Sequence, residues 1–183
     1  MQTLQNRLQE IKYDFTEEQC NSCFKEIAQL LFNNYAAQNG EKIFRITDIE
    51  FYFYGPKIND ERTNQPNRHI TYERTTPAGY WSFHDSGVDL SFESDKDKGY
   101  GGGILIRGIK QIEPKEKKAI SGCLNTYWEL FEEYVSAFKS VAPNPHLIPF
   151  DFESHPDIQN GFRVRLSKIE KTSRMWRYSI KCN

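Results

Sequence analysis

Apolar residues recur at helical spacing through the first 40 residues. The first set predicts a short amphipathic helix: Leu4, Leu8 and Ile11. Thr16 followed by Gln19 is typical of a capping box, which indicates that a second helix begins there. Apolar positions at 20–31 continue that helix, and we expect it to end near Asn39-Gly40 because glycine commonly follows a helix.

Runs of β-branched and aromatic residues predict strands through the middle of the chain. The longest run is IFRITDIEFYFY at 43–54, which ends at Gly55-Pro56. Residues 88–93 alternate between apolar and polar, as a half-buried strand does. Further strands are expected at 69–73, 80–84 and 104–109, with a turn in GYGGG at 99–103.

The second half of the chain begins with a predicted helix. Pro114 is expected to open this helix, which should run to about Val141. Several prolines then make 142–161 a long irregular connection. Two strands near 162–169 and 174–181 are expected to pair as a C-terminal hairpin.

These elements predict a single α+β domain with a curved, mostly antiparallel sheet and flanking helices. A length of 183 residues suits one such domain. We divide it into a helical N-terminal part (1–40), a sheet with the candidate site (41–114), a helix (115–141) and a C-terminal basic hairpin (162–183).

Composition limits the classes of function. The formal net charge of -1 gives no overall attraction to nucleic acid, so such binding would need a local basic patch. The N-terminus has no long apolar run, so we expect no membrane span and a cytoplasmic location. Cys20 and Cys23 form a CxxC without a second ligand pair, so we expect core-facing helix residues. The four histidines lack metal-binding spacing, and neither a metal nor a cofactor is expected.

Glu50 is the first candidate for chemistry, because it lies among aromatic residues of the strand at 43–54. Strict alternation places it on one face with Phe44, Ile46, Asp48, Tyr52 and Tyr54. Flanking aromatic rings could stack on a planar ligand beside the carboxylate. The alternative is a solvated strand face on which Glu50 pairs with a lysine or an arginine.

The C-terminal stretch is strongly basic. Residues 162–183 contain seven Lys/Arg and one acid. Paired as a hairpin, these strands would carry their basic side chains on one face: Arg163, Arg165, Arg177 and Lys181. Such a face can contact phosphates. It equally fits an edge hairpin that its charges keep soluble.

Three stretches in order resemble the alkyladenine (3-methyladenine) DNA glycosylases. RITDIEFYFYGP (45–56) is similar to that family's strand with the catalytic glutamate, and GGILIRGIKQIEP (102–114) to its leucine-arginine-alanine stretch. RVRLSKIEKTSRMWRYSIKCN (163–183) is similar to the family's C-terminal hairpin. IAQLLFNN (27–34) also resembles a helix of the family, and the likeness covers most of 24–114 and 161–183.

The resemblance implies roles for individual residues. Glu50 falls on the catalytic glutamate, Tyr52 on a tyrosine that stacks on the extruded base, and Arg107 on an arginine close to the catalytic water. Phe83 replaces a second stacking tyrosine. The basic residues of the C-terminal hairpin would hold the DNA backbone.

Some positions depart from the family pattern. Ser86 precedes Gly87 where the family has a tyrosine that wedges into the duplex. Glu61 stands where the family has a base-contacting histidine, and His69 is the candidate to replace that histidine. The family's middle segment is replaced by residues 115–160.

The implied function is that of a monomeric, monofunctional DNA glycosylase in base-excision repair. It would hydrolyse the N-glycosidic bond of a damaged or modified base that has been flipped out. Without the wedge, mismatched or single-stranded DNA should be the better substrate. Two alternatives stay open: a non-catalytic nucleic-acid-binding or other binding module on the same fold, and an N-glycosidase for free nucleosides or nucleotides.

Overall fold

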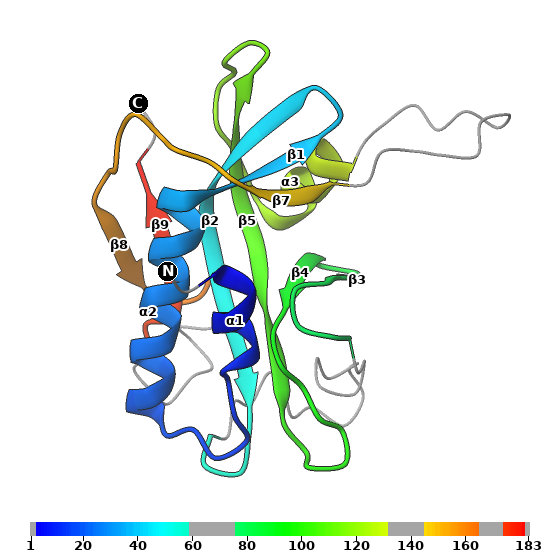
Figure 1. The fold of residues 1–183 in the computed structure, drawn as a ribbon, viewed down its shortest axis with the longest axis vertical. Helices are drawn as coiled ribbons and strands as arrows, with labels where there is room; N and C mark the ends of the chain where they lie inside the picture. Colours follow the sequence, from blue (N-terminus) through cyan, green and yellow to red (C-terminus); the bar gives the residue numbers. More distant parts are fainter. Residues whose placement is uncertain (1–2, 59–75, 132–144, 165–173, 182–183) are drawn as a thin grey trace, which may run out of the picture.

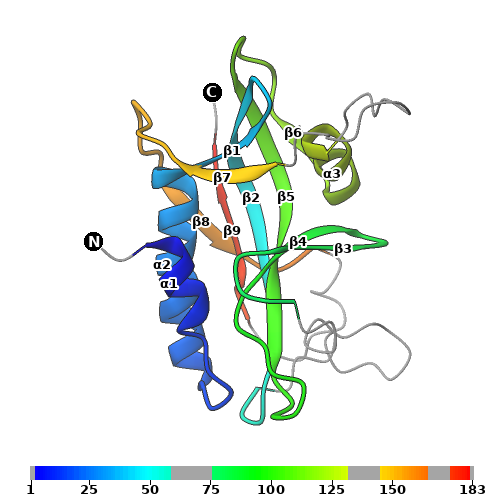
Figure 2. The same ribbon diagram turned by 45° about the vertical axis from the view of Figure 1, so that its right-hand side comes forward.

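A computed structural model describes residues 3–58, 76–131, 145–164 and 174–181 of the chain. Within these ranges nine strands form one curled antiparallel sheet, and α1 (Leu4–Gln9) and α2 (Glu17–Asn34) lie against one of its faces (Figure 1). Helix α3 (Cys123–Phe131) lies on the other side of β5 (Gly101–Glu113) from these two helices (Figure 2). The predicted α+β class with a curved, antiparallel sheet is therefore confirmed.

Two long strands, β2 (Lys42–Tyr54) and β5, pair over most of their length. The other strands are β1 (Tyr35–Asn39), β3 (Trp81–His84), β4 (Gly87–Ser91), β6 (Ile120–Ser121), β7 (His146–Pro149), β8 (Ile158–Gly161) and β9 (Arg177–Ile180). In the sheet, β4 lies next to β5, and β3 lies next to β4. On the edge away from β5, β2 pairs with β1 and, at residues 48–50, with β9. β7 extends the sheet beyond β1, β8 extends it beyond β9, and β6 pairs with β5. The β9 branch therefore brings C-terminal residues next to the middle of β2.

The hydrophobic core lies between the sheet and helices α1 and α2. Phe24 of α2 stacks on Phe51 of β2 with ring centroids 4.3 Å apart, and Trp176 meets Phe24 edge-on at 5.1 Å. All three rings are fully buried. Since successive side chains of a strand point to opposite faces, the packing of Phe51 on α2 turns Glu50 toward the other face of the sheet.

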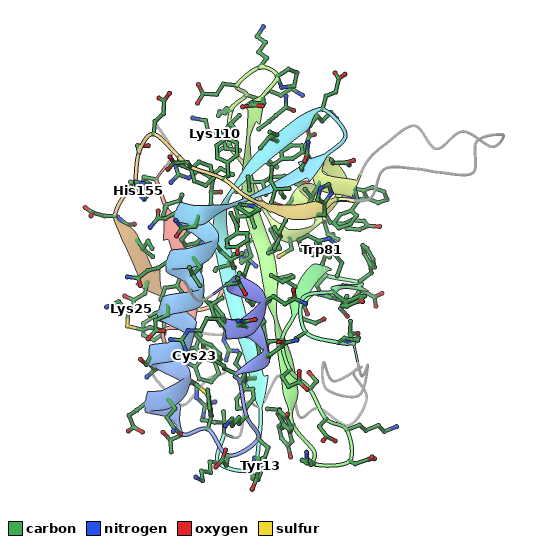
Figure 3. All side chains as sticks on the ribbon, in the orientation of Figure 1. Tyr13, Cys23, Lys25, Trp81, Lys110 and His155 are labelled. Carbon is green, nitrogen blue, oxygen red and sulfur yellow. The ribbon has the colours of Figure 1, made fainter. Side chains whose placement is uncertain are left out.

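The start of α2 follows the sequence prediction. The Thr16 side chain accepts the Gln19 N–H, and the Gln19 side chain accepts the Thr16 N–H, so the capping box is confirmed. Cys20 and Cys23 are free thiols buried in the core, as expected. Figure 3 shows Cys23 on the side of α2 toward α1, and Lys25 on its outer side.

The end of α2 differs from the prediction. The helix stops at Asn34, and residues 35–39 form β1 instead of a last helical turn. β1 pairs with both β2 and β7, and these ladder hydrogen bonds outweigh the local helical pattern. Gly40 has φ 58 and makes the turn from β1 to β2. A glycine with positive φ occurs in hairpin turns as well as at helix ends, so Asn39-Gly40 in the sequence is compatible with either structure.

The helix predicted from Pro114 to Val141 begins later than expected. β5 continues to Glu113, where it pairs with Ile43, and the chain then returns as β6 along Gly108 and Ile109. The residues after Pro114 connect β5 to β6 and form β6, so α3 begins only at Cys123. The part of the predicted helix beyond residue 131 lies outside the described residues.

Two details of the central strands also differ. Gly101, Gly102 and Gly103 belong to β5 and not to a turn, because the chain reverses earlier, between Asp95 and Tyr100. β4 is buried on both faces, where the alternation predicted a half-buried strand. Irregular pairing around residues 46–49 of β2 also breaks strict alternation. The hydrophobic core consequently contains Phe44 and Ile46 together with Phe51.

The C-terminal hairpin uses other residues than predicted. β9 pairs with β8 at 158–161, which falls in the segment expected to be irregular, and β7 also lies in that segment. Residues 162–164 follow β8 without joining a strand. The predicted strand at 69–73 and residues 165–173 lie outside the described residues.

Candidate functional site

Glu50 is completely buried on the sheet face that α1 and α2 leave free, with an exposed fraction of 0%. Its Oε1 accepts a hydrogen bond from the Val164 N–H at 2.5 Å, and its Oε2 accepts one from the Tyr52 hydroxyl at 2.8 Å. Arg107 Nη1 donates to Oε2 at 3.4 Å, and Arg107 Nε lies 3.3 Å from Oε1. These partners replace the hydration that a carboxylate loses on burial.

Arg107 of β5 lies between two carboxylates and a thiol. Its Nε is 3.9 Å from Asp48 Oδ2 as well as close to Glu50, and its Nη1 donates to Cys123 Sγ at 2.9 Å. Burial raises the pKa of the Cys123 thiol, while the charge of Arg107 acts in the opposite direction. The sulfur is therefore a neutral thiol near pH 7, and its contact with Arg107 joins the start of α3 to the site.

Asp48 and Arg177 form a second ion pair beside the first. Arg177 Nε and Nη2 donate to Asp48 Oδ1 and Oδ2 at 3.0 and 2.8 Å, a bidentate arrangement. In the pairing of β2 with β9, Arg177 is opposite Glu50, while Asp48 is opposite Ser179. The guanidinium of Arg177 thus reaches past its direct neighbour to the next carboxylate along β2.

Arg163 covers the ring of Tyr52. Its guanidinium carbon lies 4.7 Å from the Tyr52 centroid and 5.3 Å from that of Trp176, and its Nη1 donates to the Phe51 carbonyl at 3.0 Å. Only 1% of Arg163 is exposed. Burial, and after it the negative charge of Glu50, raises the pKa of Tyr52, so its hydroxyl stays protonated and donates to Glu50.

Asp89 and His84 add a further polar pair on the same sheet face. Asp89 and Glu50 lie in one row across β4, β5 and β2. Asp89 leans over Gly103, where an added Cβ would lie 3.4 Å from Asp89 Oδ2. His84 Nε2 is 3.1 Å from Asp89 Oδ1, and the Ser86 N–H donates to His84 Nδ1 at 3.2 Å. With Nδ1 as acceptor, the neutral ring carries its hydrogen on Nε2, facing Asp89.

Three of the sequence-predicted site residues come together, namely Glu50, Tyr52 and Arg107. Phe83 does not join them. It is paired with Val88, on the sheet face opposite to that of Asp89 and Glu50. Its ring, 55% exposed, packs edge-on against α3. Tyr52 and Phe83 therefore do not face each other across one pocket, and the reason is the register of the β3–β4 hairpin.

The residues predicted to hold the DNA backbone do not form one basic face. Arg163 is buried and Arg177 is paired with Asp48, because β9 joins the edge of β2 and turns these arginines toward the site. Lys181 is exposed. Arg165, together with the predicted base-contacting His69, lies outside the described residues.

Sequence reasoning assigned no role to three groups that line the site: the Asp48 carboxylate, the Asp89 carboxylate and the Val164 N–H. Asp48 precedes Glu50 by two positions, so strand alternation offered a signal for it. For Asp89 the sequence indicates only a polar position of an alternating strand. The Val164 N–H has no sequence signal, since any residue except proline supplies a backbone donor.

Metal-ligand clusters and membrane-spanning helices are absent from the described ranges. These ranges contain no group of three or more His, Cys, Asp and Glu side chains suited to a metal ion. Within the same ranges, no helix combines the length and the apolar character needed to cross a lipid bilayer.

Comparisons with known proteins add no family assignment. No protein-family model matches the chain, and a search of curated proteins finds no similar protein. The likeness to the alkyladenine DNA glycosylases therefore rests on the motifs at 27–34, 45–56, 102–114 and 163–183 alone.

Proposed function

We propose that this protein hydrolyses N-glycosidic bonds, that a modified base in DNA is its substrate, and that Glu50 accepts a proton from the attacking water. The observation that carries the proposal is the buried Glu50–Arg107 ion pair on the sheet face away from the hydrophobic core. A buried ion pair is often less stabilising than apolar residues of similar size. Local arrangements that cost stability are expected mainly at functional sites, where they serve chemistry.

The chemistry needs few groups. Glu50 would take a proton from a water molecule as that water attacks the anomeric carbon, and the bond between sugar and base breaks with its electron pair leaving on the base. The carboxylate also stabilises the positive charge that develops on the sugar ring. Arg107 holds the carboxylate in place, and the Tyr52 hydroxyl fixes its second oxygen.

Access to Glu50 requires a local movement. Because Glu50 has no exposed surface, water reaches it only after one of the groups that cover it moves, and we assign this movement to the Val164 N–H on Oε1. A base that stacks on the covered side of Tyr52 must also displace the guanidinium of Arg163. Base stacking on an aromatic ring contributes about 1–3 kcal/mol, which can offset the lost contact. The described conformation is then the closed form of the site.

The motifs and the fold support the same assignment. Glu50, Tyr52 and Arg107 lie on motifs that resemble the alkyladenine DNA glycosylases, and they contact one another across β2 and β5. Val164 belongs to the third such motif and bonds to Glu50. A glycosylase-like arrangement of the curled sheet is therefore part of the proposal.

A free nucleoside or nucleotide is the second candidate substrate. The observation that favours it is the burial of Arg163 and the pairing of Arg177 with Asp48. Arg163 is thus buried, and the guanidinium of Arg177, although 35% of its side chain is exposed, is engaged by Asp48. A small substrate would not need an extended basic surface.

The test is to incubate the protein with oligonucleotides that carry defined modified bases, in duplex, mismatched and single-stranded form. Abasic sites are detected by alkaline strand cleavage, and parallel reactions with free nucleosides and nucleotides are followed by chromatography of the released base. Glu50→Gln should lower base release by about 10²-fold or more, since it removes the proton acceptor. Glu153→Gln, at an exposed position, is the matched control and should leave the rate unchanged.

The possible results separate the candidates. Abasic sites in DNA support the first substrate, and base release from free nucleosides alone supports the second. DNA binding without release of any base would replace both with a non-catalytic binding role. Wild-type rates in Glu50→Gln would show that another residue accepts the proton.

A further inference from the structure

Arg177 forms its ion pair with a residue that is not its direct partner in the sheet. Glu50 is opposite Arg177 in the pairing of β2 with β9, yet both hydrogen bonds of the guanidinium go to Asp48. Side chains directly opposite each other in antiparallel strands start about 4.5–5.5 Å apart at Cβ. The side chain of Arg177 is therefore long enough to reach Glu50 as well as Asp48.

Arg107 also lies close to both carboxylates. Its Nε is 3.3 Å from Glu50 Oε1 and 3.9 Å from Asp48 Oδ2. Two carboxylates and two arginines thus lie within reach of one another on one sheet face. The structure holds one of their pairings, with Arg177 on Asp48 and Arg107 on Glu50.

A second arginine on Glu50 would change its chemistry. Each Glu50 oxygen already has one hydrogen-bond donor and one arginine nitrogen within 3.4 Å. Arg177 could bind there only by displacing Tyr52, Arg107 or the Val164 N–H. An added positive charge beside a carboxylate favours its ionised form and makes it a weaker proton acceptor.

We propose that Asp48 is a positioning residue that keeps Arg177 away from Glu50, so that Glu50 stays paired with Arg107 alone and can accept a proton. This inference rests on the proposed function of Glu50. The charged and titratable groups that face Glu50 come from six parts of the structure: Asp48 and Tyr52 on β2, Arg107 on β5, Asp89 on β4, Arg177 on β9, Cys123 on α3, and Arg163.

Three variants test the positioning role by their rates of base release. In Asp48→Asn, Arg177 turns to Glu50, and the rate should fall about tenfold, which corresponds to about 1.4 kcal/mol in the barrier. The acidic limb of the pH–rate profile should move to lower pH, because a weaker acceptor loses its proton at lower pH. In Arg177→Gln, Asp48 attracts Arg107 away from Glu50, and the rate should also fall. Asp151→Asn, at an exposed position, is the matched control.

The double variant Asp48→Asn/Arg177→Gln distinguishes positioning from a general structural role. With both groups neutral, Arg107 returns to Glu50, and the rate should be closer to wild type than in either single variant. Groups that act independently would instead give additive losses, with the double variant the slowest. That additive result would overturn the proposal.

A measurement without substrate tests the pairing itself. The side-chain Nε–Hε resonance of Arg177 is followed by NMR in wild type, in Asp48→Asn and in Asp48→Asn/Glu50→Gln. We expect slow exchange with water in the first two proteins and fast exchange only in the third. Fast exchange in Asp48→Asn would show that Arg177 does not turn to Glu50 and would overturn the proposal. A wild type that releases no base would refute the proposed function, while this measurement would still decide the pairing.

Discussion

Removing one member of the Glu50–Arg107 pair should destabilise the fold, whereas replacing both members should not. Glu50→Gln keeps the shape of the side chain but leaves the Arg107 charge without its main partner. Arg107 is held in a largely buried position, with 14% of its side chain exposed. The substitution should therefore lower the free energy of unfolding, because the buried charge of Arg107 is no longer compensated by Glu50.

The size of the effect follows from the surroundings of Arg107. Removing one partner of a buried ion pair costs about 3–5 kcal/mol. Asp48 Oδ2, 3.9 Å from Arg107 Nε, compensates part of the charge, so we expect the lower end of that range. For a chain of this length each kcal/mol lowers the melting temperature by about 2–4 °C, so Glu50→Gln should lose roughly 6–12 °C.

The double variant Glu50→Gln/Arg107→Met should recover this loss. The glutamine oxygen still accepts the Val164 N–H, and methionine fills the space of the arginine stem without a charge. Apolar replacement of a buried ion pair is often neutral or stabilising by about 1–4 kcal/mol. We therefore expect a melting temperature at or above that of the wild type, with base release abolished.

Thermal and urea unfolding, followed by the fluorescence of buried Trp176, measure these stabilities. Glu153→Gln serves again as the exposed control and should change the stability little. A double variant that is less stable than Glu50→Gln would show that the ion pair supports the fold. That result would remove the physical basis for placing Glu50 in a functional site.

Three other predictions concern stability. Gly102→Ala should destabilise by about 1–3 kcal/mol or prevent folding, because its Cβ would lie 1.9 Å from a backbone oxygen of β2, whereas Gly161→Ala, with nothing within 4 Å, should be nearly neutral in the same denaturation assay. Thr16→Ala removes the α2 N-cap and should cost about 1 kcal/mol in urea unfolding. Burial raises the pKa of Cys20 to about 12 and that of Cys23 to about 11, both from 9.0. Above pH 9 the unfolded chain thus loses protons that the folded chain keeps, and stability should fall by up to about 1.4 kcal/mol per pH unit for each thiol. The double Cys→Ala variant should show a smaller fall, and equal slopes would contradict the prediction.

The sequence alone determined the features that depend on neighbours along the chain. The capping box joins Thr16 and Gln19, three residues apart, and its two hydrogen bonds form as soon as the helix does. The core-facing positions of Cys20 and Cys23 follow from helical spacing in the same way. Strand β2 is long and rich in aromatic and β-branched residues, so its sequence pattern alone predicts a strand.

Tertiary pairing decided where elements end. Residues 35–39 could have continued α2, but β2 and β7 offer them ladder hydrogen bonds on both edges. Pro114 could have opened a helix, but β5 extends to Glu113 and the chain returns along it as β6. A local pattern cannot report hydrogen bonds with partners that lie far away in the sequence.

The candidate site divides in the same way. Glu50, Tyr52 and Arg107 were predicted from short motifs, and each motif is continuous in the chain. The Asp48–Arg177 pair and the Val164–Glu50 hydrogen bond join residues 129 and 114 positions apart. An arginine carries the same charge on a solvated hairpin as in an ion pair or under a neighbouring ring, so the sequence could not distinguish these surroundings for Arg163 and Arg177. Only the tertiary structure, in which β9 pairs with the edge of β2, decided that Arg163 covers Tyr52 and that Arg177 binds Asp48.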